Sequence, residues 1–238
     1  MRSLKLLLAI SMILIVSYDA ASVRAKSNRS TPASSVQDDN TKALREVLLN
    51  GSLNAVNELG RLDGFYKNPR VKIPMPKSLQ TVEKTLRFIG QKKAADDFVL
   101  AMNRAAEKAV PAAVEVFKNA ARQMTFTDAV RIVKGPDDAA TQFFRKTSEE
   151  NLRAKFLPVV RKFTEEVGVT AQYKNLIKQA GPIASLAGKE ATDIDGYVTQ
   201  KALDGLFLLM ADEERRIRRD PIARTSEILR KVFGIGRR

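Results

Sequence analysis

The residues best suited to chemistry stand in one segment near the middle of the chain. Asn103 and Glu107 are four positions apart, so a helix would place them on one face, with Arg104 on the adjacent face. Their neighbours are mostly Ala and Met, which predicts partial burial. A buried Arg or Glu requires a partner of opposite charge. We therefore expect Asn103, Arg104 and Glu107 either to join two parts of the fold or to bind a ligand, and the structural role is the favoured interpretation.

The absence of His, Cys and Trp restricts the catalytic chemistry open to this chain. It excludes Ser-His-Asp and Cys-His nucleophilic sites, thiol redox chemistry and the usual zinc and haem ligands. The alternative to a non-enzymatic protein is a hydrolase or other enzyme with a carboxylate-based site around Glu107, Asp138 and Asp204. That alternative requires the three carboxylates to meet in one pocket.

No cofactor and no metal site is predicted. The sequence Asp193–Gly196 is similar to the start of a calcium loop, but the fifth position is Tyr197 and the twelfth is Asp204, where the loop needs Glu. The Gly-x-Gly sequence Gly234–Gly236 stands at the end of the chain, with no helix after it to complete a phosphate loop.

The charge of the chain indicates an anionic partner. The sequence has 41 basic and 27 acidic residues, and residues 215–238 contain nine basic and two acidic ones. Such an end can bind anionic lipid, polysaccharide or a protein partner, through candidate residues Arg224, Arg230 and Lys231. Nucleic acid is not expected, because no interleaved aromatic residues or known motif support it. A basic surface without a ligand stays open as the alternative, and the Glu214–Arg218 pair is expected on a solvated charged face.

The N-terminus has the order of regions typical of a secretory signal peptide. Two basic residues are followed by an eleven-residue apolar run, Leu6–Val16, which is too short to span a bilayer. We expect residues 1–25 to be removed by cleavage after Ala25, with Ala20-x-Ser22 as the alternative site. The protein is thus expected to be secreted or periplasmic, and no later segment is apolar enough to cross a membrane.

The composition changes twice after this segment. Residues 26–40 are rich in Ser, Asn and Asp and predict a flexible leader, and residues 41–238 predict one helical domain. Asn28 and Asn50 begin N-glycosylation acceptor patterns, which matter only if the source has a eukaryotic secretory pathway.

Apolar residues recur at three-four spacing over most of the domain, which is typical of amphipathic helices. Pro69, Pro74 and Pro76 instead predict one extended segment over residues 66–76. With no convincing strand pair, the sequence predicts an all-α, single-domain bundle of about seven or eight helices. The expected helices cover residues 41–60, 78–90, 92–123 with a kink at Pro111, 125–135, 137–168 with a bend at Pro158, 170–180, 195–219 and the end after Pro221.

Several short blocks stand out along the chain by their order and spacing: Asp63–Phe65, Ile73–Pro76, Met102–Glu107, Ala139–Thr141, Ala202–Phe207 and Val232–Gly234. Taken together, they resemble one family of exported, mostly bacterial proteins, known as domain of unknown function 4197. The resemblance runs from about residue 42 to 234 and implies a helical, single-domain, exported protein with no assigned activity. It supplies no functional residues.

Overall fold

The computed structural model describes residues 32–88, 90–166, 168 and 193–219, and all regular structure in these ranges is helical. The predicted all-α class is therefore confirmed. No helix among these residues has the length and hydropathy needed to cross a membrane. The elements, of which η1 and η2 are short 3-10 helices, are α1 (Pro32–Gly60), η1 (Lys77–Leu79), α2 (Gln80–Phe88), α3 (Lys92–Ala109), η2 (Val110–Ala112), α4 (Ala113–Gln123), α5 (Phe126–Lys134), α6 (Ala139–Glu166) and α8 (Ile194–Arg219).

The first helix is longer than the sequence pattern predicts. α1 begins at Pro32 rather than at Thr41, so the second half of the expected flexible leader is helical. Proline suits the first turn of a helix, because the N–H that it lacks would have no intrahelical partner there. The expected signal peptide over 1–25 and the expected helices over 170–180 and after Pro221 lie outside the described residues.

Proline and capping residues set the boundaries of the next helices. Pro111 sits in η2 and divides the long helix predicted over 92–123, so the interruption predicted there is confirmed. The Thr125 hydroxyl accepts the N–H of Asp128 at 3.1 Å, and the Asp128 carboxylate accepts the N–H of Thr125 at 3.0 Å. This capping box starts α5 at Phe126. α6 continues through Pro158 without interruption.

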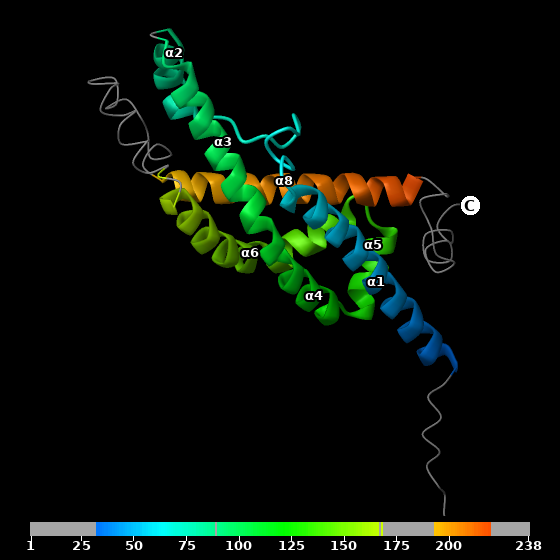
Figure 1. Ribbon diagram of the computed structural model, residues 1–238. Coiled ribbons are helices and arrows are strands. Elements are labelled where there is room, and N and C mark those ends of the chain that lie inside the picture. The colour runs from blue at the N-terminus through cyan, green and yellow to red at the C-terminus, as the bar shows by residue number, and fades with distance from the viewer. Residues whose placement is uncertain (1–31, 89, 167, 169–192, 220–238) are drawn as a thin grey trace, which may run out of the picture.

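The core of the bundle forms around α8. α1, α3 and α6 all pack against this helix, which crosses the whole body in Figure 1. Phe117 of α4 contacts Phe144 of α6 edge to face, with ring centroids 5.5 Å apart, and Phe207 of α8 at 6.3 Å. These buried rings join three helices through contacts of the geometry that aromatic pairs favour.

A hairpin of α2 and the first part of α3 projects from this body (Figure 1). Gly90, with a φ of 82°, lets the chain reverse between the two helices. The N–H of Gln91 donates to the carbonyl of Leu86 at 2.8 Å, which satisfies a group at the end of α2.

Residues 61–76 connect α1 to η1 without helix or strand, and we call them the connecting segment. The extended segment predicted over 66–76 is wrong for residues 66–71, which form turns closed by backbone hydrogen bonds from Lys67 to Asp63 and from Val71 and Lys72 to Asn68.

From Val71 to Met75, burial alternates along the chain. Lys72 and Pro74 are exposed between buried neighbours. The buried neighbours are Val71, Ile73 and Met75.

Candidate functional site

Asn103 binds the backbone of the connecting segment. Its Oδ1 accepts the N–H of Ile73 at 2.8 Å, and its Nδ2 donates to the carbonyls of Ile73 at 2.8 Å and Val99 at 2.7 Å. Asn103 is fully buried. Its amide thus satisfies both backbone groups of Ile73, which would otherwise be buried without partners.

Glu107, which is 4% exposed, holds the turn at the start of the same segment. Its Oε1 accepts the backbone N–H groups of Phe65 at 3.0 Å and Tyr66 at 3.1 Å. Its Oε2 accepts a hydrogen bond from Nη1 of Arg104 at 2.6 Å. Nη2 of Arg104 donates to Oδ1 of Asp63 at 2.5 Å. We call Asp63, Arg104 and Glu107 the Glu107 cluster.

The charges of the Glu107 cluster stabilise one another. Hydrogen bonds from Lys67 and then Arg104 hold the pKa of Asp63 below its ordinary value. Burial lowers the pKa of Arg104, but hydrogen bonds with Glu107 and Asp63 outweigh this and raise it overall. Asp63 has a φ of 66°, a conformation that Asp tolerates better than most residues.

The three residues predicted for this part of α3 therefore lie together, and all three hold the connecting segment. Both terminal nitrogens of Arg104 are engaged by carboxylates, and its side chain is 22% exposed. The hydrogen bonds of Asn103 and Glu107 go to backbone groups and to Arg104. This arrangement supports the structural role for Asn103, Arg104 and Glu107.

A second buried carboxylate, Glu214 on α8, is placed at the start of α6. Its Oε1 accepts the N–H of Ala140 at 2.9 Å, and its Oε2 accepts the N–H of Thr141 at 2.8 Å and the Thr141 hydroxyl at 2.9 Å. Arg218 donates to Oε1 through Nε at 3.0 Å, and to the carbonyl of Ile132, near the end of α5, at 2.8 Å. We call Thr141, Glu214 and Arg218 the Glu214 cluster.

The expectation of a solvated charged face at Glu214 and Arg218 is therefore wrong. The two residues are 6% and 8% exposed. An acid at this position suits the positive end of the α6 dipole, and Arg218 neutralises the carboxylate away from water.

The structure does not bring together the three carboxylates of the alternative enzymatic hypothesis. Glu107 lies under the connecting segment, and Asp138 accepts a hydrogen bond from Gln142 at the start of α6. Asp204 lines a cleft to which neither of the others contributes. Within the described ranges, no three His, Cys, Asp or Glu side chains are grouped so that they could hold a metal ion.

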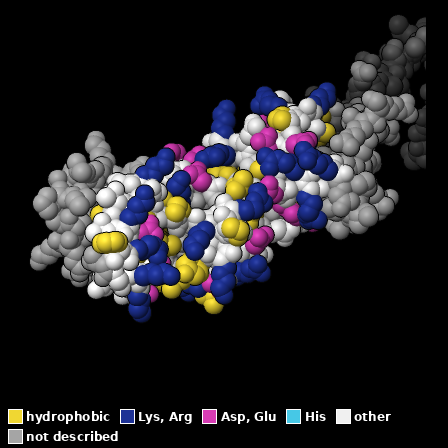
Figure 2. Space-filling view, turned by 90° about the horizontal axis from the view of Figure 1, so that it is seen from above, with side chains coloured by type: hydrophobic (Ala, Val, Ile, Leu, Met, Phe, Trp, Pro, Cys, Tyr) yellow, Lys and Arg dark blue, Asp and Glu magenta, His cyan; other side chains and the backbone are white. Residues whose placement is uncertain are grey.

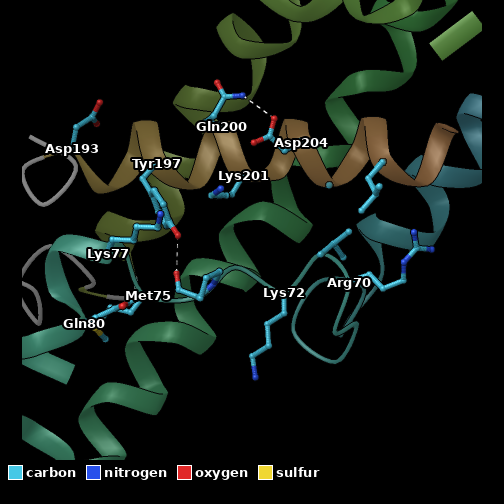
Figure 3. A pocket seen from close by; sticks show the side chains of 14 residues that line it. Arg70, Lys72, Met75, Lys77, Gln80, Asp193, Tyr197, Gln200, Lys201 and Asp204 are labelled. Atoms are coloured by element: carbon cyan, nitrogen blue, oxygen red, sulfur yellow. Dashed lines mark hydrogen bonds between the residues drawn. The ribbon is translucent and has the colours of Figure 1, made fainter. Parts of the chain in front are cut away.

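The cleft that Asp204 lines is a candidate binding site. It encloses about 1110 Å³ between the second half of the connecting segment and α8. The Tyr197 hydroxyl crosses it and donates to the carbonyl of Pro74 at 3.1 Å (Figure 3). Three lysines line it, and we call it the lysine cleft. They are Lys72 on the connecting segment, Lys77 at the start of η1 and Lys201 on α8.

Acidic side chains do not neutralise these lysines. Lys72, Lys77 and Lys201 have no acidic partner among the described residues. Asp204 is bound by Arg145 at 2.9 Å and by Gln200 at 3.1 Å. In Figure 3 it points away from the connecting segment, whereas Tyr197 points toward it. The charges of Lys77 and Lys201 are therefore available to a ligand between the walls. The Lys72 side chain extends away from α8 and its ammonium lies over the Tyr66 ring, so its charge adds to the outer side of the same wall (Figure 3).

Two other charges of the cleft are already satisfied within the fold. Arg70 forms an ion pair with Asp212 at 2.5 Å, so its charge is compensated. Oδ1 of Asp193 accepts the N–H of Gly196 at 2.9 Å at the start of α8. Asp193 keeps its negative charge, but a single carboxylate leaves the three lysines in excess in the cleft.

The basic end of the chain is only partly described. Arg215, Arg216 and Arg219 form ion pairs with acidic residues, so much of the charge expected there is compensated. Arg224, Arg230 and Lys231 lie outside the described residues, as does Asn28. Figure 2 shows basic side chains over the whole visible face, with acidic ones between them. Net charge alone therefore does not locate a binding site.

The acceptor pattern at Asn50 lies inside α1. The side chain of Asn50 is exposed, whereas Ser52 is buried and its hydroxyl donates to the carbonyl of Leu48 at 2.8 Å. In the folded helix, the Asn of this pattern is therefore in solvent, whereas the Ser hydroxyl that the pattern requires is buried.

Sequence reasoning missed Lys72, Lys77, Lys201 and Tyr197 as possible functional residues. They come from parts of the chain more than 100 positions apart, and only the fold places them on one cleft. One usable signal was present, because Val71, Ile73 and Met75 alternate with other residues and this pattern turns Lys72 outward.

One protein family matches most of the chain. The family model, described as "Protein of unknown function (DUF4197)", matches residues 34–234. The comparisons with curated proteins and with solved structures found no match.

Proposed function

We propose that this chain, which belongs to the DUF4197 family, is an exported, non-enzymatic protein that binds an anionic ligand in the lysine cleft. The observation that carries the proposal is the position of Lys72, Lys77 and Lys201. All three line one cleft and none has an acidic partner among the described residues. Like charges held along a concave surface attract anions over a distance of about a Debye length, ~8 Å at physiological ionic strength.

The way in which the cleft is built supports this proposal. One wall is a non-helical segment that would not keep its shape alone, and Asn103 and Glu107 fix it to α3 through four backbone hydrogen bonds. The other wall is α8, the helix around which the core forms. A site held in this way is ordered before its ligand arrives, which reduces the entropic cost of binding.

Export is part of the proposal because of the N-terminal sequence. A basic start, an apolar run of eleven residues and a small residue at Ala25 are in the order that signal peptidase substrates have. The carboxylate-based enzyme has no comparable support, since Glu107, Asp138 and Asp204 have separate partners.

Retention on immobilised heparin, a polyanion, tests the proposed site. The cleft variant carries Lys72→Gln, Lys77→Gln and Lys201→Gln. The control carries Lys108→Gln, Lys134→Gln and Lys155→Gln, which removes three lysines that are also exposed and without acidic partners in the described ranges but lie outside the cleft. We expect the cleft variant to elute at clearly lower salt than the control. Because both variants have the same net charge, such a difference would report on the position of the lysines rather than on their number. Equal elution of the two variants would overturn the proposal.

A further inference from the structure

The lysine cleft is long rather than round. The connecting segment runs antiparallel to α8. Arg70 forms an ion pair with Asp212, and four residues later the carbonyl of Pro74 accepts a hydrogen bond from the hydroxyl of Tyr197, nearer the start of α8. From Tyr197, the α8 residues that line the cleft extend to Leu208, eleven residues along the helix or about 16 Å. The two walls are in contact where Val71 lies against Gly205, since an added Cβ there would be only 3.2 Å from the Cβ of Val71. The cleft is therefore a groove that is elongated along α8 and is closed where these two residues meet.

The positive charge is spread along this groove. Lys72 lies on the connecting segment and Lys77 begins η1 five residues later, at most about 16 Å away along the backbone. Lys201 lies on α8, on the opposite wall. The groove therefore matches a ligand that carries negative charges at intervals along an extended chain.

The aromatic side chains near the groove do not favour a ligand that stacks. The Lys201 ammonium lies 5.9 Å from the centroid of the Tyr197 ring, and the Lys72 ammonium lies 4.4 Å from that of Tyr66. Tyr66 also has Arg104 at 5.6 Å and does not line the cleft, so Tyr197 is the one aromatic side chain in the described lining. Single-stranded nucleic acids bind by stacking successive bases on several aromatic faces, and this cleft does not offer such a series.

Apolar groups line the groove between its charges. Leu208 is 37% exposed, and Pro74 is exposed on the opposite wall. A polypeptide with apolar residues between its carboxylates can use both kinds of surface, whereas a sulfated polysaccharide offers mainly charge. Pro74 and Pro76 lack N–H groups, so recognition would depend on side chains rather than on strand pairing.

We infer that the lysine cleft binds an extended acidic polypeptide segment with apolar residues between its carboxylates. This inference rests on the proposed anion binding and names the class of ligand. Carboxylates of the segment pair with Lys72, Lys77 and Lys201, and its apolar side chains contact Leu208 and Pro74.

Fluorescence anisotropy of a labelled peptide of alternating Glu and Leu residues, long enough to span the groove, tests the inference on the full chain. A peptide with Gln for Glu is the matched control ligand. We expect the Glu peptide to bind and the Gln peptide not to bind. We also expect the three-lysine cleft variant to bind the Glu peptide about tenfold more weakly than the Lys108, Lys134 and Lys155 control, from three ion pairs of modest strength.

The place of binding is tested with a single tryptophan. The natural chain has no Trp, so a Leu208→Trp variant has one reporter in the groove. Its emission is expected to change on addition of the Glu peptide, and an unchanged emission with undiminished affinity would contradict binding in this cleft.

Parallel titrations with a heparin oligosaccharide and a single-stranded oligonucleotide separate the two proposals. Suppose that the oligosaccharide or the oligonucleotide binds the parent chain more tightly than the cleft variant, and that the Glu peptide does not bind. The polypeptide inference is then wrong, and the proposed anion site stands. If no probe depends on these lysines, the proposed function itself fails.

Discussion

Two buried glutamates, Glu107 and Glu214, have similar surroundings and different consequences. Glu107 and Glu214 each accept two successive backbone N–H groups, and each pairs with an arginine on its own helix. Glu107 holds a segment without regular structure, and its arginine remains 22% exposed and has a second partner in Asp63. Glu214 joins the ends of two helices to a third, and Arg218 is almost completely buried.

This difference separates the part of the molecule that supports the fold from the part that shapes the cleft. The Glu214 cluster connects α5, α6 and α8, which all contribute to the core, so its loss affects the whole bundle. The Glu107 cluster fixes the connecting segment, which forms one wall of the lysine cleft. Its loss is expected to disturb binding more than its effect on global stability would suggest.

Removal of Glu214 is expected to have the largest effect on stability. Glu214→Ala leaves Arg218 buried without its acid and two N–H groups of α6 without acceptors, at a cost of about 3–5 kcal/mol. Urea unfolding followed by circular dichroism measures this loss. The double variant Glu214→Met/Arg218→Met, which leaves no unpaired charge, is expected to recover part of it. A loss below about 1 kcal/mol for Glu214→Ala would contradict the burial of this pair.

Removal of Glu107 is expected to cost less, about 2–3 kcal/mol, because Arg104 keeps Asp63 and reaches water. The same unfolding experiment gives the comparison. Glu107→Ala is also expected to weaken retention on heparin although no lysine is removed, since the connecting segment, which carries Lys72, loses its anchor at Phe65 and Tyr66. Glu107→Gln, which keeps an oxygen for the N–H groups of Phe65 and Tyr66, is expected to retain more of both properties.

A smaller effect is expected where the connecting segment packs against Gly205 of α8. A Cβ at Gly205 would lie 2.8 Å from Cε1 of the buried Phe65 ring, so Gly205→Ala is expected to destabilise by about 1–3 kcal/mol. Gly51→Ala on α1 is the matched control. There the nearest atom, Cδ1 of Ile217, is at an ordinary 3.6 Å, and the gain in helix propensity should stabilise by up to about 1 kcal/mol. Thermal melts showing the same sign for both variants would contradict the packing at Gly205.

The smallest expected effect is a pH dependence of the free energy of unfolding that arises from Asp63. Its folded pKa lies below the ordinary value of 3.8, so the unfolded chain binds a proton more readily. The stabilisation is complete well above 3.8 and is lost as the pH falls through the folded pKa. Asp63→Asn should therefore destabilise at about pH 7, and the loss should shrink as the pH falls below 3.8. A loss that stays the same over this range, measured by urea unfolding, would show that charge is not the cause.

The two clusters also explain what the sequence can and cannot predict. Glu107 is surrounded in sequence by Ala and Met, so its burial and its need for a partner follow from local composition. Glu214 has Asp212, Glu213, Arg215 and Arg216 as neighbours, a pattern typical of solvated helix faces. Its burial depends on the start of α6, more than 70 positions earlier, and no local pattern carries that information.

The helices follow the same rule. Their periodic apolar residues and the breaks at Gly60, Pro111 and Gly135 are local features and were predicted correctly. The start of α1 at Pro32 was not, because residues 32–40 lack the apolar stripe on which the prediction depended. The lysine cleft needs α8 and the connecting segment in contact, and therefore it emerges only from the fold.

Hydrogen exchange measured by mass spectrometry on the full chain, with and without heparin, tests the central claim most directly. We expect slower exchange of backbone amides in residues 70–77 and at the start of α8, where the ligand would cover both walls of the cleft. The three-lysine cleft variant should lose this protection, and the Lys108, Lys134 and Lys155 control should keep it. Protection confined to residues 220–238, around Arg224, Arg230 and Lys231, would place anion binding on the basic end of the chain and contradict the account.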